Sequence, residues 1–120
     1  MSKPAIAAVL IIAALHIYFS CIEMLWWESK GDAIMASFDA KMLERTKAMA
    51  ANQGLYNLFI SAGLIWSVIK REHHIALFFL LFVVIAGVFG GLTIGPKLFA
   101  AQAVPGLLAL AAVFWSNRSS

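Results

Sequence analysis

Four apolar segments follow one another along the chain, separated by short polar breaks. They cover residues 4–27, 48–69, 75–94 and 98–115. A helix of about 20 apolar residues spans the hydrocarbon core of a bilayer, and backbone polar groups in lipid must be paired within the segment. The pattern predicts a single transmembrane domain over residues 1–120, an all-α four-transmembrane-helix up-down bundle. The first segment begins like a signal peptide, but it has no clear cleavage site and is expected to span the membrane.

The longest polar break, residues 28–43, is the only sizeable segment predicted outside the membrane. Asp32 is expected to be an N-cap. The helical spacing of Ile34, Phe38 and Met42 predicts a short helix lying on the membrane surface, with an ordinary connector as the alternative.

Composition agrees with a membrane protein. Of the 120 residues, 62% are hydrophobic and 12% are charged, whereas soluble domains are about 45–50% apolar. The formal net charge of +3 is typical of Lys and Arg at the ends of membrane helices. The basic residues form no stripe interleaved with aromatic residues, so nucleic acid is not an expected partner. We expect a multi-pass protein of the cell membrane whose partner is the lipid bilayer.

Basic residues stand on both predicted faces of the membrane. The face with both termini carries Lys3, Lys70, Arg71 and Arg118. The opposite face carries Lys30, Lys41, Arg45, Lys47 and Lys97. Because the two sets are similar in size, the positive-inside rule leaves the orientation open.

Polar residues within the predicted helices gather toward one face of the membrane. In an up-down bundle, this face holds the end of the first helix, the start of the second, the end of the third and the start of the fourth. The polar residues near it are His16, Ser20, Glu23, Asn52, Gln53, Tyr56, Asn57, Thr93 and Gln102. A charge at the bilayer centre costs about 2.5–3.5 kcal/mol, so such residues face the bundle interior, a water-filled cavity or a subunit interface.

Helical spacing groups the polar residues of the first helix. His16, Ser20 and Glu23 are four and three residues apart, so they line one helix face. At a rise of 1.5 Å per residue, Glu23 lies roughly 6 Å and His16 roughly 16 Å from the residue-27 end.

The second helix carries a matching set in the stretch "AANQGLYN". Asn52 and Tyr56 share one face, Gln53 and Asn57 share the neighbouring one, and Arg45 lies seven residues before Asn52 on its face. We expect this stretch to form an inward polar wall opposite the polar face of the first helix.

The cluster is the predicted site for a small lipophilic ligand or substrate. If the protein is an enzyme, its acid–base residues are Glu23, His16 and Tyr56. The ligand-binding residues are expected to be Asn52, Gln53, Asn57, Arg45 and Gln102. No metal site is expected, although His16 and Glu23 would be the ligands of a metal and His16 the axial ligand of a haem. The alternatives are a structural or assembly protein whose polar cluster only holds helices together, and a small transporter or channel, which the apolar opposite leaflet disfavours.

Glycine, proline and histidine residues add three local predictions. Close helix packing is predicted at Gly87, Gly90 and Gly91. Pro105 is expected to mark a kink. The neighbouring His73 and His74 are expected to lie in a solvated loop.

Four stretches resemble a known family. "LHIYFSCIEMLWW", "ANQGLYNLFISAGLIW", "GLTIGP" and "QAVPGLLAL" are similar to the small four-helix bacterial membrane family catalogued as domain of unknown function thirteen-oh-four. The resemblance covers nearly the whole chain. It implies the four-helix fold and carries no established activity.

A second resemblance concerns "ERTKAMAANQGLYN", which is similar to the second-helix motif of the MAPEG family of membrane glutathione and eicosanoid enzymes. Arg45, Lys47 and Asn52 match in place. The family's Glu-Asn pair is replaced by Leu55-Tyr56 or Tyr56-Asn57, and "FFLLFVVIAGVFGG" lacks the Arg used near the thiol site. The resemblance implies a MAPEG-like homotrimer with sites between subunits, whereas the missing residues argue against glutathione as a ligand.

Overall fold

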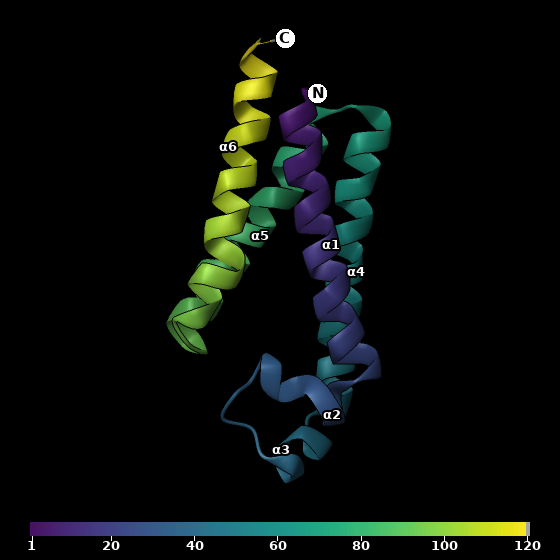
Figure 1. Cartoon of the computed structure of the whole chain (residues 1–120), viewed down its shortest axis with the longest axis vertical. Helices are drawn as coiled ribbons and strands as arrows, with labels where there is room; N and C mark the ends of the chain where they lie inside the picture. The colour runs from purple at the N-terminus through teal and green to yellow at the C-terminus, as the bar shows by residue number, and fades with distance from the viewer. Residues whose placement is uncertain (120) are drawn as a thin grey trace. The chain divides into compact units, whose positions relative to one another are not determined.

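The computed structural model describes residues 1–119, and almost all of them are helical (Figure 1). The elements are α1 (Lys3–Leu25), α2 (Trp27–Lys30), the 3₁₀ turn η1 (Gly31–Ala33), α3 (Ala40–Arg45), α4 (Lys47–Lys70), α5 (His73–Thr93), the π-helical turn η2 (Phe99–Ala103) and α6 (Val104–Ser119). The described residues contain no β-strand. The predicted all-α class is confirmed.

Within residues 1–119, three helical segments are long and apolar enough to cross a membrane. They are Lys3–Leu25, His73–Thr93 and Phe99–Arg118. Helix α4 has 24 residues, which is long enough, but three amide side chains lower the hydropathy of its N-terminal half. The structure therefore has three candidate spans, compatible with a multi-pass membrane protein, where the sequence predicted four.

The chain divides into two compact units. One combines Met1–Ala13 with the chain from Ala62 onward, and the other is Ala14–Ser61. Helices α1 and α4 contribute to both units because each crosses a boundary between them.

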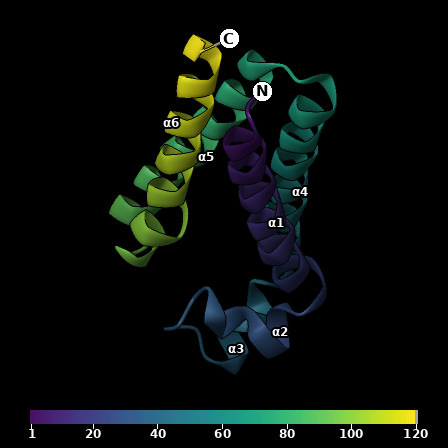
Figure 2. The ribbon, with the colours of Figure 1, turned by 45° about the horizontal axis from the view of Figure 1, so that its top comes forward.

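In the first unit, α5 and α6 lie side by side in both views (Figure 1, Figure 2). A Cβ added at Gly87 would lie 2.8 Å from the Ala103 Cα, and one at Gly91 would lie 2.5 Å from the Phe99 ring. At Gly90 it would lie 2.7 Å from the Leu98 side chain. Such distances leave no space for a side chain, so the predicted close packing at these three glycines is confirmed.

The fourth predicted helix is irregular where Pro105 enters it. The Val104 N–H donates to the Phe99 carbonyl oxygen, five residues earlier, which closes the π-helical turn η2. Pro105 has no N–H to donate and disfavours the ordinary helical bond at its own position. The kink expected at Pro105 stays a prediction, which this π turn favours because such turns are a recognised cause of helix bending.

Ser116 joins three helix ends in the first unit. The Ser2 backbone N–H donates to the Ser116 Oγ at 2.7 Å, and the His73 Nε2 lies 3.0 Å from the same oxygen. Ser116 itself is buried. The loop predicted for His73 and His74 is wrong, because α5 begins at His73. His74 is exposed, whereas His73 is half-buried and contacts α6.

The segment after α1 differs from its prediction. Asp32 lies inside η1 and caps no α-helix. The N-cap is Asp39, whose carboxylate accepts a hydrogen bond from the Met42 N–H at 2.9 Å, at the start of α3. The single surface helix predicted from Ile34, Phe38 and Met42 is wrong as well, since the backbone turns between η1 and α3.

A small apolar cluster explains the spacing of Ile34 and Phe38, whereas Met42 is exposed. Ile22, Trp27, Leu43 and Ala50 are buried together, and Ile34, Met35 and Phe38 pack against them. Apolar side chains in an irregular segment thus cover a core at intervals that imitate one face of a helix.

Candidate functional site at the α1–α4 contact

Most of the predicted site residues belong to the unit Ala14–Ser61. These are His16, Glu23, Arg45, Asn52, Gln53, Tyr56 and Asn57. Gln102 lies in η2, within the other unit. The candidate site is therefore described from the first set alone.

One face of α1 carries buried polar groups, as predicted. The His16 and Ser20 side chains are each 2% exposed, and Glu23 is half-buried. The His16 ring meets the Phe19 ring edge-on, with 5.7 Å between centroids. The Ser20 hydroxyl donates to the Met24 sulfur at 3.4 Å. The four-and-three spacing in the sequence correctly identified the inward face of this helix.

Gly54 brings α4 into close contact with that face. A Cβ added at Gly54 would lie 2.5 Å from the Met24 Cγ, 3.1 Å from the Glu23 Cβ and 3.2 Å from the Ser20 carbonyl oxygen. Only a glycine allows the backbones to approach so closely. Sequence reasoning did not single out Gly54, although a glycine between two amide-bearing turns of an apolar helix was an available signal.

The close approach allows a hydrogen bond between the two helices. The Asn57 Nδ2 donates to the Glu23 Oε1. Asn57 lies one turn beyond Gly54, so the glycine contact and the polar contact support each other. We call Ser20, Glu23, Gly54 and Asn57 the α1–α4 seam.

The other polar residues of the stretch 50–57 do not face α1. Asn52 and Gln53 are exposed, and Tyr56 is 57% exposed. At about 100° per residue, Asn57 lies about 60° from Gly54 around the helix, whereas Asn52, Gln53 and Tyr56 lie about 100–160° away. The inward polar wall predicted for this stretch is therefore met by Asn57, and the other three side chains point elsewhere within this unit.

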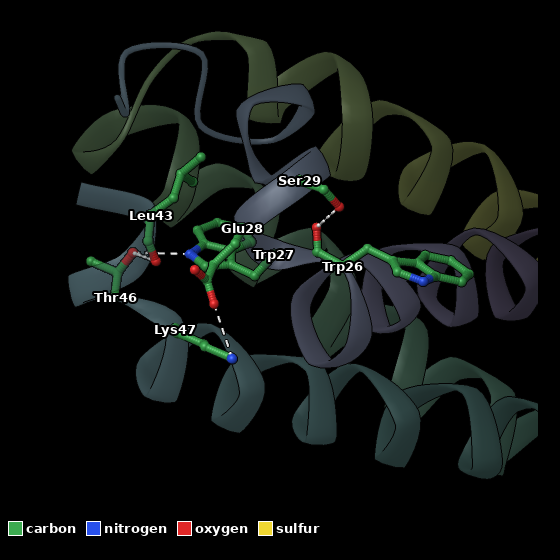
Figure 3. A network of polar contacts seen from close by, with 7 residues as sticks. All are labelled: Trp26, Trp27, Glu28, Ser29, Leu43, Thr46 and Lys47. Atoms are coloured by element: carbon green, nitrogen blue, oxygen red, sulfur yellow. Dashed lines mark hydrogen bonds and ion pairs between the residues drawn. The ribbon is translucent and has the colours of Figure 1, made fainter. Parts of the chain in front are cut away.

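A polar network covers the end of the α1–α4 pair (Figure 3). The buried Trp27 donates from its Nε1 to the Thr46 Oγ1 at 2.9 Å, and the Thr46 hydroxyl donates to the Met42 carbonyl oxygen at 2.7 Å. A Cβ at Gly31 would lie 2.7 Å from the Leu43 Cδ2. Sequence reasoning placed Trp27 at a helix end but missed this packing, which depends on residues 19 positions away.

The surface of the same unit carries charged groups. Glu28 and Lys47 form an ion pair at 2.9 Å, with 50% and 66% of their side chains exposed. Arg45 is exposed at the end of α3. These charges lie on the surface, in contrast to the half-buried Glu23 carboxylate.

Comparison with known families identifies the chain. The family model described as Protein of unknown function (DUF1304) matches residues 10–114. The chain belongs to this family. The match confirms the first resemblance and includes every predicted site residue. No curated protein and no solved structure matches this DUF1304 chain, and the resemblance to the MAPEG family is not shown by these comparisons.

The chemistry available to the DUF1304 chain at its seam is that of a carboxyl group held by a neutral amide. One carboxylate offers two oxygens with about four acceptor positions, and the Asn57 amide occupies one of them. No group of three His, Cys, Asp or Glu side chains able to hold a metal ion occurs within residues 1–119. The chemistry of the seam is therefore that of a hydrogen-bond acceptor.

Proposed function

We propose that this DUF1304 protein is a multi-pass membrane protein whose α1–α4 seam binds a small lipophilic molecule carrying a hydrogen-bond donor or an amine. The observation that carries the proposal is the Glu23–Asn57 hydrogen bond between two helices. A carboxyl group is costly at membrane depth, and such residues in spanning helices mark ligand or ion sites by default.

Helix α4 is proposed as the fourth spanning helix. Its 24 residues make a helix of about 36 Å at 1.5 Å per residue, more than the roughly 30 Å of a hydrocarbon core. Its polar groups are the reason that its hydropathy is low, and one of them, Asn57, is paired with Glu23. Pairing of this kind lowers the cost of burying an amide in lipid.

Geometry supports binding better than acid–base catalysis. His16 and Glu23 are seven residues apart on α1, about 10 Å along the axis, so they are poorly placed to act on the same atom. Tyr56 is 57% exposed on a different side of α4 from the seam. Binding through Glu23 needs no contribution from either residue.

A neutral substitution tests the site. We would extract the full chain into nanodiscs with its native lipids and record native mass spectra of the wild type, Glu23→Gln and Glu28→Gln. Both variants remove one carboxylate, but Glu28 is exposed and paired with Lys47 outside the seam. A reproducible bound mass in the wild type and in Glu28→Gln, lost in Glu23→Gln at unchanged thermal stability, is the expected result.

Two outcomes would contradict the proposal. Absence of any bound mass in the wild type would show that the seam holds no ligand. Loss of stability in Glu23→Gln, without any ligand to lose, would assign the seam to helix packing alone.

The same spectra test assembly. We propose a homo-oligomer, with a trimer favoured, in which Asn52, Gln53 and Tyr56 find partners on a neighbouring copy. These side chains are exposed on one chain, and amides in a membrane stabilise helix association when they are paired. A monomer in nanodiscs would contradict this assembly while leaving the seam proposal to its own test.

A further inference from the structure

Positive charge is concentrated at one end of the first unit. Four exposed side chains from three parts of the chain define this basic end, namely Lys3, Lys70, Arg71 and Arg118. The helix ends that carry these four residues hold one acidic side chain, Glu72. Together they give +4 − 1 = +3, which equals the formal net charge of the whole chain.

The Ser116 contacts explain why these residues gather. Ser2 and His73 both lie within hydrogen-bond distance of the Ser116 Oγ. Lys3 follows Ser2, Arg71 stands two residues before His73, and Arg118 stands two residues after Ser116. The contacts of the buried Ser116 therefore hold the starts of α1 and α5 close to the end of α6. The basic residues that flank these contacts lie close together as a result.

The segment 28–47 has a different charge balance. It carries four basic residues, Lys30, Lys41, Arg45 and Lys47, and four acidic residues, Glu28, Asp32, Asp39 and Glu44, so its net charge is 4 − 4 = 0. One of these cations is already paired with a carboxylate. The basic end is thus set apart by its excess of positive charge, four basic residues against one acidic residue.

Aromatic residues border the basic end. Trp66 and Trp115 are 50% and 63% exposed. The Arg118 guanidinium lies 5.9 Å from the Trp115 ring centroid and 6.0 Å from that of Phe114. An apolar helix ending in exposed Trp and then in a cation matches the order of acyl chain, interface and headgroup in a bilayer.

We infer that the basic end binds the phosphate headgroups of anionic phospholipids. The inference rests on the proposed membrane location, but it does not depend on a ligand at the α1–α4 seam. Each Lys or Arg near an anionic membrane surface strengthens the attraction roughly fivefold. A phospholipid headgroup and free inorganic phosphate both offer an anionic phosphate group. We propose that the lipid headgroup is the ligand.

Lipid titration provides the test. The full chain in neutral detergent would be titrated with short-chain phosphatidylglycerol, with phosphatidylcholine of the same chain length and with inorganic phosphate at matched ionic strength. Thermal unfolding and native mass spectrometry would report stabilisation and retained lipids. We expect stabilisation by phosphatidylglycerol that fades in high salt, because screening weakens exposed charges.

Matched lysine pairs localise the effect. Lys3→Gln with Lys70→Gln should weaken phosphatidylglycerol binding by about 5- to 25-fold, since two cations are lost. Lys30→Gln with Lys41→Gln removes the same charge from the neutral segment and should leave binding within about twofold. Replacing Lys3 and Lys70 by Arg should preserve binding, because the charge is kept.

Three results would overturn the inference. They are equal stabilisation by phosphatidylcholine, full stabilisation by inorganic phosphate alone, and equal weakening by the two glutamine pairs. Failure of the seam experiment leaves this titration unaffected, because none of the lysines belongs to the seam.

Discussion

A double-mutant cycle on Glu23 and Asn57 measures the contact on which the proposed site depends. The single variants Glu23→Ala and Asn57→Ala and the double variant would be compared with the wild type. A hydrogen bond to a charged group contributes about 1.5–3 kcal/mol in soluble proteins. Side-chain hydrogen bonds between membrane helices average about 0.6 kcal/mol and reach about 1.7 kcal/mol. Because this bond joins a half-buried carboxylate to an amide on another helix, we expect a coupling energy of about 1–2 kcal/mol.

The two single variants should differ in cost. Asn57→Ala leaves a carboxylate without its amide donor, and an unpaired charge is expensive to bury. Glu23→Ala leaves a neutral amide, which is cheaper to leave unpaired. We therefore expect Asn57→Ala to lower the free energy of unfolding by about 2 kcal/mol, and Glu23→Ala to lower it by about 1 kcal/mol.

Equilibrium unfolding in mixed detergent micelles is a suitable assay, with ligand-depleted protein so that binding does not contribute. The exposed pair Glu28 and Lys47 provides the control cycle, with an expected coupling below about 0.5 kcal/mol. A seam coupling no larger than that of the control pair would refute the reasoning. A greater cost for Glu23→Ala than for Asn57→Ala would show that packing, and not the hydrogen bond, dominates.

Two further predictions concern packing. Gly87→Ala should lower the free energy of unfolding by about 1–3 kcal/mol, because its Cβ would clash with the backbone nitrogen and Cα of Ala103, which cannot move aside as a flexible side chain can. Gly95→Ala, with nothing within 4 Å, should change the free energy of unfolding by less than about 0.5 kcal/mol. Equal effects would contradict the packing. Trp27→Phe removes the indole N–H that donates to Thr46, so it should lower the free energy of unfolding by about 1–2 kcal/mol and speed proteolysis of residues 31–39. Trp26 is exposed, so the control variant Trp26→Phe should change little in the same unfolding and proteolysis assays.

Local pattern determined the long helices and the inward face of α1. Long apolar segments can pair their backbone groups only as helices in lipid, and the observed α1, α4 and α5 differ from the predicted ranges by one or two residues at each end. The fourth predicted helix is divided between η2 and α6. The spacing of His16, Ser20 and Glu23 identified a buried face, since residues three and four apart share a side of any helix. Membership of the DUF1304 family was also predicted correctly from the sequence alone.

Contacts between distant residues were decided by the tertiary structure. Helical spacing could not tell which of Asn52, Gln53, Tyr56 and Asn57 would face α1, because that depends on where Gly54 permits the closest approach. The pairing of His73 with Ser116 and of Trp27 with Thr46 likewise joins residues 43 and 19 positions apart. Periodicity records the side of a helix on which a residue lies, whereas the angle at which two helices meet depends on the fit of the side chains between them.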